Sequence, residues 1–81
     1  MNRDEIFEKL AGIFYDVFDD REITISDYTT AENIDDWDSL SHITLISEIE
    51  NVFNIRFTLQ DMQDMKNVGE ILDLIERKLK K

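Results

Sequence analysis

The residues with the clearest chemical potential lie in the stretch DDWDSLSH, residues 35–42. One serine, Ser39, stands among three aspartates and comes three residues before the single histidine of the chain, His42. Residues three apart on a helix are neighbours, so the pair could form a nucleophile and a base. Hydrolysis would also require an orienting acid and an oxyanion hole, and no G-x-S-x-G turn surrounds Ser39. We therefore expect no enzyme activity from this chain.

Two other roles are open for Ser39. Asp and Ser are both favoured at helix N-caps, so either Asp38 or Ser39 could simply begin a helix. A serine exposed at the start of a helix can also carry a covalent group, because the free amides and the positive dipole end favour an attached phosphate. The neighbouring Trp37 is typical of a side chain that packs against the following helix. The residues by themselves do not choose between a cap and an attachment site.

The charge of the chain is strongly acidic. Its 81 residues include 19 acidic and 9 basic side chains, for a formal net charge of −10. Such a surface repels phosphate backbones and disfavours nucleic-acid binding, whereas it attracts protein partners with basic faces. Acidic charge also serves solubility alone in small domains. The concentration of acids around Ser39 favours the partner interpretation.

The composition argues against several other classes of site. The chain has no cysteine, which removes disulfides, thiolate nucleophiles and cysteine metal sites. One histidine cannot form a zinc site by itself, and an EF-hand counted from Asp36 would have Ser41 and Ser47 in place of its glycine and glutamate. The apolar runs are too short to span a bilayer, and no signal-peptide core follows the N-terminus. We expect one cytoplasmic, monomeric domain over residues 1–81, with no metal and no membrane contact.

A helical period dominates the elements that must position Ser39. Apolar residues recur at three- and four-residue spacing over 3–18, 39–53 and 67–80, which predicts three main helices, and residues 58–65 predict a short one. Capping residues support these starts: Asn2 with Glu5, Thr58, and Asn67 with Glu70. The stripe predicted to be buried in the second helix consists of Ile43, Leu45, Ile46, Ile49, Val52 and Phe53.

Two short stretches alternate in the manner of strands, EITIS at 22–26 and IRF at 55–57. They could pair, but an isolated two-stranded ribbon this short is only marginally stable. We therefore expect extended segments that fill the core with Ile23, Ile25, Ile55 and Phe57. The predicted fold is all-α, a small bundle of three main helices plus one short helix. The long loop between the first and second helices, residues 19–38, leads directly to Ser39, and loops of that length tend to be functional.

This combination resembles the acyl carrier protein family. The resemblance rests on Asp38-Ser39-Leu40 at the start of a helix, on the acidic-then-phenylalanine run EIENVFNIRF at 48–57, and on the order of helix, long loop, helix, short helix and helix. It implies that Ser39 receives 4′-phosphopantetheine from coenzyme A, and that the terminal thiol of this arm holds acyl groups as thioesters. Because the chain has no cysteine, the reactive sulfur would then come with the cofactor.

The resemblance also implies roles for the neighbours of Ser39. Asp38 would cap the helix and contact the phosphopantetheinyl transferase. Other partners would be acyl-loading and synthase enzymes with basic docking faces. The expected partner-binding residues are Asp36, Trp37, Leu40, Ile43 and Glu48, with Glu50 on the same docking face.

The sequence around Ser39 departs from many fatty-acid carriers, which have a glycine where this chain has Asp36. WDSLSH looks more like carriers of specialised polyketide, peptide or modified-sugar pathways, so we expect an acyl carrier of a specialised polyketide- or peptide-type pathway. A peptidyl or aminoacyl carrier and a fatty-acid carrier are the alternatives within the family. Outside it, the alternative is an unmodified acidic adaptor that binds protein partners through Leu40 and the nearby acids.

Overall fold

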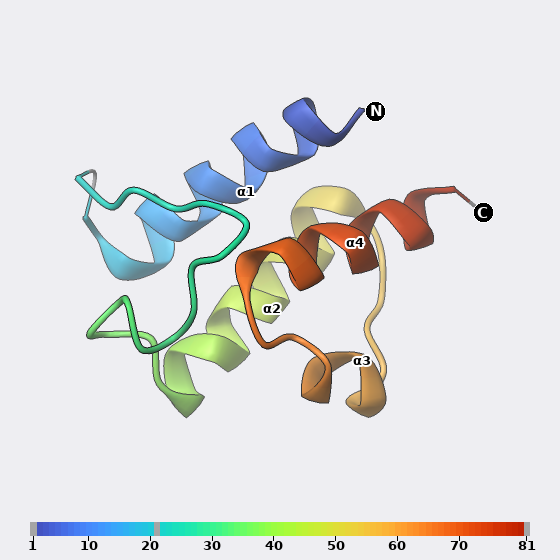
Figure 1. Cartoon of the computed structure of the whole chain (residues 1–81). Helices are drawn as coiled ribbons and strands as arrows, with labels where there is room; N and C mark the ends of the chain where they lie inside the picture. The colour runs from blue at the N-terminus through green and yellow to red at the C-terminus, as the bar shows by residue number, and fades with distance from the viewer. Residues whose placement is uncertain (1, 21, 81) are drawn as a thin grey trace.

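The fold is built from helices alone across the part of the chain described by the computed structural model, residues 2–20 and 22–80. This confirms the predicted all-α fold, with three main helices and one short one (Figure 1). The long connection between the first two helices is also as expected. The four helices are α1 (Arg3–Phe18), α2 (Ser39–Phe53), α3 (Leu59–Gln63) and α4 (Val68–Leu79).

The helices begin where the sequence places capping residues. The Asn2 side chain accepts a hydrogen bond from the Glu5 amide at 2.9 Å, and the Glu5 carboxylate accepts one from the Asn2 amide, which completes a capping box. Thr58 forms a capping box with Asp61 at α3, and the Asn67 side chain caps α4 by accepting a hydrogen bond from the Glu70 amide. The short helix α3 is shorter than the predicted range 58–65, because its helical residues end at Gln63.

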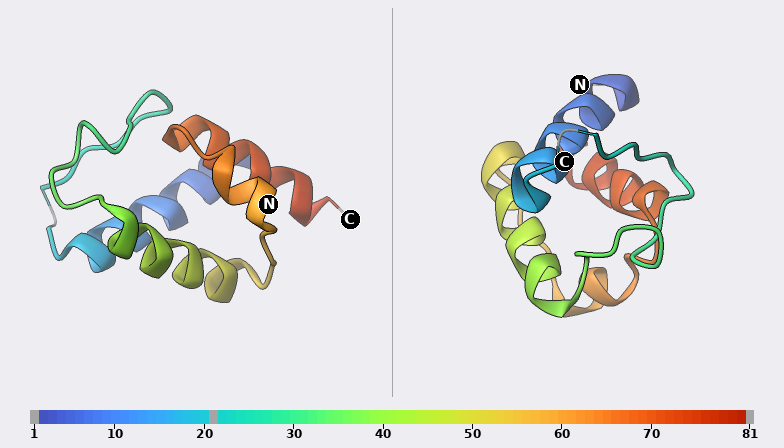
Figure 2. Two further views of the ribbon diagram at one scale, coloured as in Figure 1. Left: turned by 90° about the horizontal axis from the view of Figure 1, so that it is seen from below. Right: turned by 90° about the vertical axis from the view of Figure 1, so that its left-hand side faces the viewer.

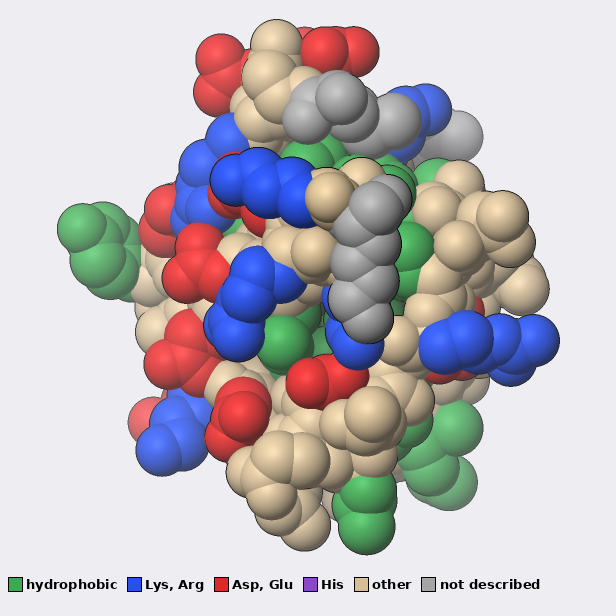
Figure 3. Space-filling view, turned by 90° about the vertical axis from the view of Figure 1, so that its right-hand side faces the viewer, with side chains coloured by type: hydrophobic (Ala, Val, Ile, Leu, Met, Phe, Trp, Pro, Cys, Tyr) green, Lys and Arg blue, Asp and Glu red, His purple; other side chains and the backbone are tan. Residues whose placement is uncertain are grey.

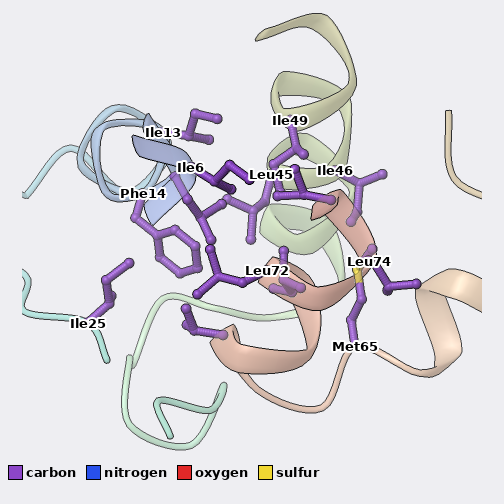
Figure 4. Close-up of a cluster of buried hydrophobic side chains, with 14 of the residues drawn as sticks. Ile6, Ile13, Phe14, Ile25, Leu45, Ile46, Ile49, Met65, Leu72 and Leu74 are labelled. Carbon is purple, nitrogen blue, oxygen red and sulfur yellow. The ribbon is translucent and has the colours of Figure 1, made fainter. Parts of the chain in front are cut away.

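The core lies where α1 packs against both α2 and α4. Figure 4 shows the side chains of these helices converging on one cluster, joined by Ile25 from the long loop and Met65 from the α3–α4 connection. The two views of Figure 2 show the same arrangement, with the long loop crossing from the end of α1 to the start of α2. The residues of this cluster that are wholly buried are Ile6, Leu10, Phe14, Leu45, Ile49, Val68, Ile71 and Ile75.

Two residues of the predicted α2 stripe are not buried. The packed face follows Leu45, Ile49 and Phe53, whereas Ile43 is 66% exposed and Val52 is 48% exposed. Ile43 lies about half a turn from Leu45 at 3.6 residues per turn, so it points to the opposite side of the helix. Val52 is in the last turn, where Phe53 takes the buried position. The prediction that these two residues belong to the buried stripe was wrong, whereas the expectation that Ile43 contacts partners stays a prediction.

The two strand-like stretches are extended segments, as predicted. Ile25 and Phe57 are buried, while Ile23 and Ile55 are partly buried against the core. The backbone amide of Phe57 donates a 2.8 Å hydrogen bond to the Glu50 carboxylate. This contact fixes the segment after α2 without any strand pairing.

The long loop is fastened to the start of α4. The amide of Val68 donates to the carbonyl of Thr29 at 2.9 Å, and the amide of Gly69 donates to the carbonyl of Asp27 at 2.8 Å. These two amides are among those that a helix start leaves without intrahelical partners. A side chain at position 69 would bring its Cβ within 2.9 Å of the Asp27 carbonyl oxygen, so this close approach requires glycine.

A charged cluster adds a second fastening between loop and helices. Arg3 at the start of α1 contacts Asp27 of the loop at 3.1 Å and Asp73 of α4 at 2.8 Å, and it also pairs with Glu76. One guanidinium therefore joins three segments. Within residues 2–20 and 22–80, no helix has both the length and the apolar character that crossing a membrane would require.

Candidate attachment site

Asp38 and Ser41 begin α2 and form its cap. The Asp38 carboxylate accepts a hydrogen bond from the Ser41 amide at 3.0 Å, and the Ser41 hydroxyl oxygen accepts one from the Asp38 amide at 2.8 Å. The Ser41 hydroxyl in turn donates to the carbonyl of Asp36 at 2.7 Å. The cap therefore does not use Ser39, which is the first helical residue and is exposed.

The sequence analysis did not predict the role of Ser41 at the start of α2. Its signal was present, because a serine three residues after Asp38 occupies the position that completes a capping box. The hydrogen bond from the Ser41 amide also lowers the pKa of Asp38, so this carboxyl stays ionised at more acidic pH than a free aspartate. Asp38 is thus an anion whose carboxylate is hydrogen-bonded at the helix start.

Trp37 is part of the core and not part of the surface. Its ring packs edge-on against Phe14 at a centroid distance of 5.2 Å, and only 6% of the residue is exposed. This corrects the expectation that Trp37 contacts partners, because the indole is held in the core and only a small part of it reaches the wall of a surface cavity. A tryptophan just before a helix packs against it here, as such residues commonly do.

The Trp37 indole also fixes the orientation of His42. Its Nε1–H donates a hydrogen bond to His42 Nδ1 at 3.0 Å, and the two rings stack with centroids 5.9 Å apart. Burial lowers the pKa of His42, so the imidazole is neutral at physiological pH. With Nδ1 accepting, the proton of the neutral ring resides on Nε2. His42 is therefore a hydrogen-bond donor and not a base directed at Ser39.

The other predicted docking residues divide into exposed and engaged ones. Leu40 and Ile43 are 77% and 66% exposed and, three positions apart, share a side of α2. Asp36 and Glu48 are also exposed. Glu50 is only partly exposed, and its carboxylate accepts the Phe57 amide, a tertiary contact that holds the fold together. Its place on the docking face stays a prediction.

A surface cavity of about 360 Å³ lies beside Ser39. Its lining combines apolar residues with Ser39, His42, Lys66 and the anionic Asp38, so it offers both apolar and polar contacts. Its lining comes from the long loop, the start of α2 and the α3–α4 connection: Ala31, Trp37, Asp38, Ser39, His42, Met65 and Lys66.

Comparisons with known proteins show which family this chain resembles. A family model described as the phosphopantetheine attachment site matches residues 8–75. Acyl carrier protein from Coprothermobacter proteolyticus is 34% identical over 98% of this chain and 96% of that relative, and acyl carrier protein from Thermosynechococcus vestitus is 31% identical over 98% of each. A solved structure of holo acyl carrier protein from Geobacter metallireducens is 45% identical, with a TM-score of 0.86 over 90% of this chain and 84% of that one.

The exposed hydroxyl at a helix start and the adjoining mixed cavity fit the cofactor of this family, 4′-phosphopantetheine, which is attached covalently. The fold, the matched residues and the relatives agree. The chain belongs to the acyl carrier protein family, whose members carry a phosphopantetheine attachment site.

Proposed function

We propose that Ser39 is the residue to which 4′-phosphopantetheine is attached, and that the chain carries acyl groups without catalysing a reaction itself. The observation that carries this proposal is the division of labour at the start of α2. Asp38 and Ser41 form the cap, while the exposed Ser39 opens onto the cavity. A serine that only capped the helix would be engaged as Ser41 is.

Attachment requires a phosphoryl transfer from coenzyme A. The Ser39 Oγ forms a phosphoester bond, the phosphoanhydride bond of coenzyme A breaks, and adenosine 3′,5′-bisphosphate leaves. The hydroxyl proton must pass to a base. Asp38 is a poor base because hydrogen bonding lowers its pKa, and His42 uses its unprotonated nitrogen to accept the Trp37 indole. The phosphopantetheinyl transferase therefore supplies the base, which accords with a chain that is not an enzyme.

When attached, the arm supplies a terminal thiol that holds acyl groups as thioesters for partner enzymes. The residues of this chain position that arm at the start of α2. Asp38 fixes the helix start that presents Ser39, and the apolar side chains of Leu40 and Ile43 stand beside it as partner contacts.

The charge distribution supports docking at this end of the molecule. Lysine and arginine side chains gather among acids on the face where α1 begins and α4 ends (Figure 3). α2 begins at the other end of the molecule (Figure 1), and Ser39 is its first residue. Asp36 and Glu48 are exposed on this part of the chain and suit transferase, acyl-loading and synthase enzymes with basic faces.

The proposed pathway is a specialised polyketide- or peptide-type synthesis in the cytoplasm, with the chain acting as a monomer. Its support is the sequence WDSLSH around the attachment serine, with Asp36 in place of glycine. A fatty-acid carrier is the alternative, since the relatives are named simply as acyl carrier proteins. Loading the arm with each class of acyl-transfer enzyme, and comparing the rates, distinguishes the two.

The absence of cysteine gives a direct test of attachment. Because the chain contains no thiol of its own, incubation with coenzyme A, Mg²⁺ and a broad-specificity transferase, followed by desalting, should leave one titratable thiol per chain. Ser39→Ala should leave none, and Ser47→Ala, which removes another exposed α2 serine, should behave as the wild type. An unmodified adaptor would acquire no thiol while the folded protein persisted, and that result would contradict the proposal.

A further inference from the structure

Trp37 and His42 lie on either side of Ser39 in the chain and are joined across the start of α2. Trp37 is the residue before the Asp38 cap, and His42 is the fourth residue of the helix. This is the spacing of a hydrophobic staple, which fixes the direction from which the chain enters a helix. The two rings stack with centroids 5.9 Å apart, and the indole Nε1–H donates to His42 Nδ1 at 3.0 Å. The staple of α2 therefore contains a group that titrates.

The staple connects the start of α2 to the hydrophobic core. The Trp37 ring packs against Phe14 and Phe18 of α1, with centroid distances of 5.2 Å and 6.4 Å. His42 is joined to this core through the indole. Because Ser39 lies between the two stapled residues, the position of its hydroxyl depends on their link to α1.

Protonation of His42 is incompatible with the hydrogen bond of the staple. An indole nitrogen can only donate, and an imidazolium carries a proton on both ring nitrogens. The acceptor at Nδ1 is therefore lost when the ring gains its second proton. Burial lowers the pKa of His42 below its usual value of 6.5. The bond is thus present in the neutral ring and is lost as pH falls through this lowered pKa.

The charged groups around the imidazole have opposite signs. The anionic Asp38 at the helix start and the cationic Lys66 of the α3–α4 connection line the same cavity as His42. The two α1 side chains that pack on the indole are uncharged phenylalanines, and the nearest charged side chain along α2, Glu48, is more than one turn away. The positive end of the helix dipole also disfavours an imidazolium here. Among the described residues, none of the ion pairs includes His42.

We propose that the Trp37–His42 staple positions Ser39 for attachment, and that protonation of His42 opens the staple. Neutral His42 accepts the indole, so the chain that leads into α2 remains packed on α1 and Ser39 is presented at a defined helix start. Once His42 is protonated, the indole loses its partner and the helix start is no longer fixed. Attachment should therefore slow in acid. The inference rests on the proposed attachment at Ser39.

Both partners can be observed directly, because the chain has one tryptophan and one histidine. In the ¹⁵N-labelled protein before attachment, the indole and the imidazole nitrogens are followed by nuclear magnetic resonance as pH is lowered. We expect the neutral imidazole in its Nε2–H form, and an indole signal that changes with the same midpoint as the imidazole. An Nδ1–H form, or an indole signal independent of the imidazole titration, would overturn the staple.

Trp37→Phe tests the indole, because it keeps an aromatic ring but has no N–H to donate. The hydrogen bond favours the neutral imidazole, so its removal should raise the pKa of His42. Circular dichroism verifies that the variant is folded. An unchanged His42 pKa in the folded variant would show that the indole does not control the ring, against the proposal.

The effect on attachment is measured as transferase kcat/KM against pH for the wild type and for His42→Asn. Asparagine keeps an oxygen that can accept the indole and does not titrate, so the ratio of wild type to variant removes the pH dependence of the transferase itself. We expect a ratio that is constant above about pH 6.5 and falls by roughly two- to tenfold below the His42 pKa, the equilibrium weight of one net hydrogen bond.

The outcomes separate the staple from the attachment. A ratio that does not change with pH overturns the positioning role and leaves attachment standing, whereas wild type that acquires no group at any pH overturns both. In Trp37→Phe the hydrogen bond is absent at every pH, so the acid-dependent fall in the ratio to His42→Asn should disappear. If the fall persists in this variant, the charge of His42 alone causes it, and the staple is overturned.

Discussion

Ser39 and Ser41, two positions apart at the start of α2, have different roles. Ser41 exchanges hydrogen bonds with Asp38 and Asp36, whereas Ser39 is exposed and takes no part in the cap. The chemistry of the site depends on this difference, because a hydroxyl needed for the helix could not be esterified without loss of structure. The free-energy cost of removing each side chain should follow the same division.

We expect Ser39→Ala to change the free energy of unfolding by no more than about 0.5 kcal/mol, the range of surface substitutions outside structural features. Asp38→Ala should lower it by about 1 kcal/mol, because it removes an N-cap carboxylate. Urea denaturation followed by circular dichroism measures both. A larger loss in Ser39→Ala than in Asp38→Ala would contradict this assignment.

The burial of His42 should make stability depend on pH. Burial lowers the folded-state pKa of His42 below the value of about 6.5 of a free imidazole. The unfolded chain therefore binds the proton more readily, and the stabilisation is present above about pH 6.5 and is lost as pH falls through the folded-state pKa. Wild-type protein should lose more stability than His42→Asn over this window. Parallel pH profiles for the two proteins would contradict the prediction.

At the scale of elements, the sequence predicted the features that depend on contacts within one helix turn. It missed those that depend on contacts between distant segments. Helix starts follow from capping side chains such as Asn2 and Asn67, which bond within one turn. The burial of Trp37 and the engagement of Glu50 depend on partners elsewhere in the fold, Phe14 and Phe57. Periodicity alone does not reveal those partners.

The two glycines of the chain lie in α1 and α4. Replacing each with alanine separates the effect of helix propensity from that of a tertiary contact. An added Cβ at Gly12 meets nothing within 4 Å, so Gly12→Ala should stabilise by about 1 kcal/mol through helix propensity. Gly69→Ala gains the same propensity, but its Cβ would stand 2.9 Å from the Asp27 carbonyl and displace the loop from α4. We expect a net loss of about 1 kcal/mol for Gly69→Ala.

Thermal or urea unfolding of the two alanine variants, measured beside the wild type, gives the comparison. Because the residue change is identical, the difference between the variants reports the contact between the loop and α4. Equal stabilisation of both variants would show that the loop is not fastened at Gly69.

At the scale of the whole molecule, the net charge of −10 should govern how quickly partners arrive. Transferase kcat/KM on this chain should fall as salt is raised, because screening shortens the range of attraction to a few ångströms. Glu48→Gln should lower kcat/KM more than Glu8→Gln, which makes the same charge change on the exposed surface of α1. Equal effects would indicate general attraction without a docking face at α2.

The measurement that tests the central claim most directly is the location of the attached group. After incubation with coenzyme A, Mg²⁺ and a transferase, cleavage after Arg21 and Arg56 yields one peptide that contains Ser26, Ser39, Ser41 and Ser47. Fragmentation mass spectrometry of this peptide should place the mass of one phosphopantetheine on Ser39 alone. The same mass on Ser41 or Ser47, or an unmodified peptide from folded protein, would contradict the account.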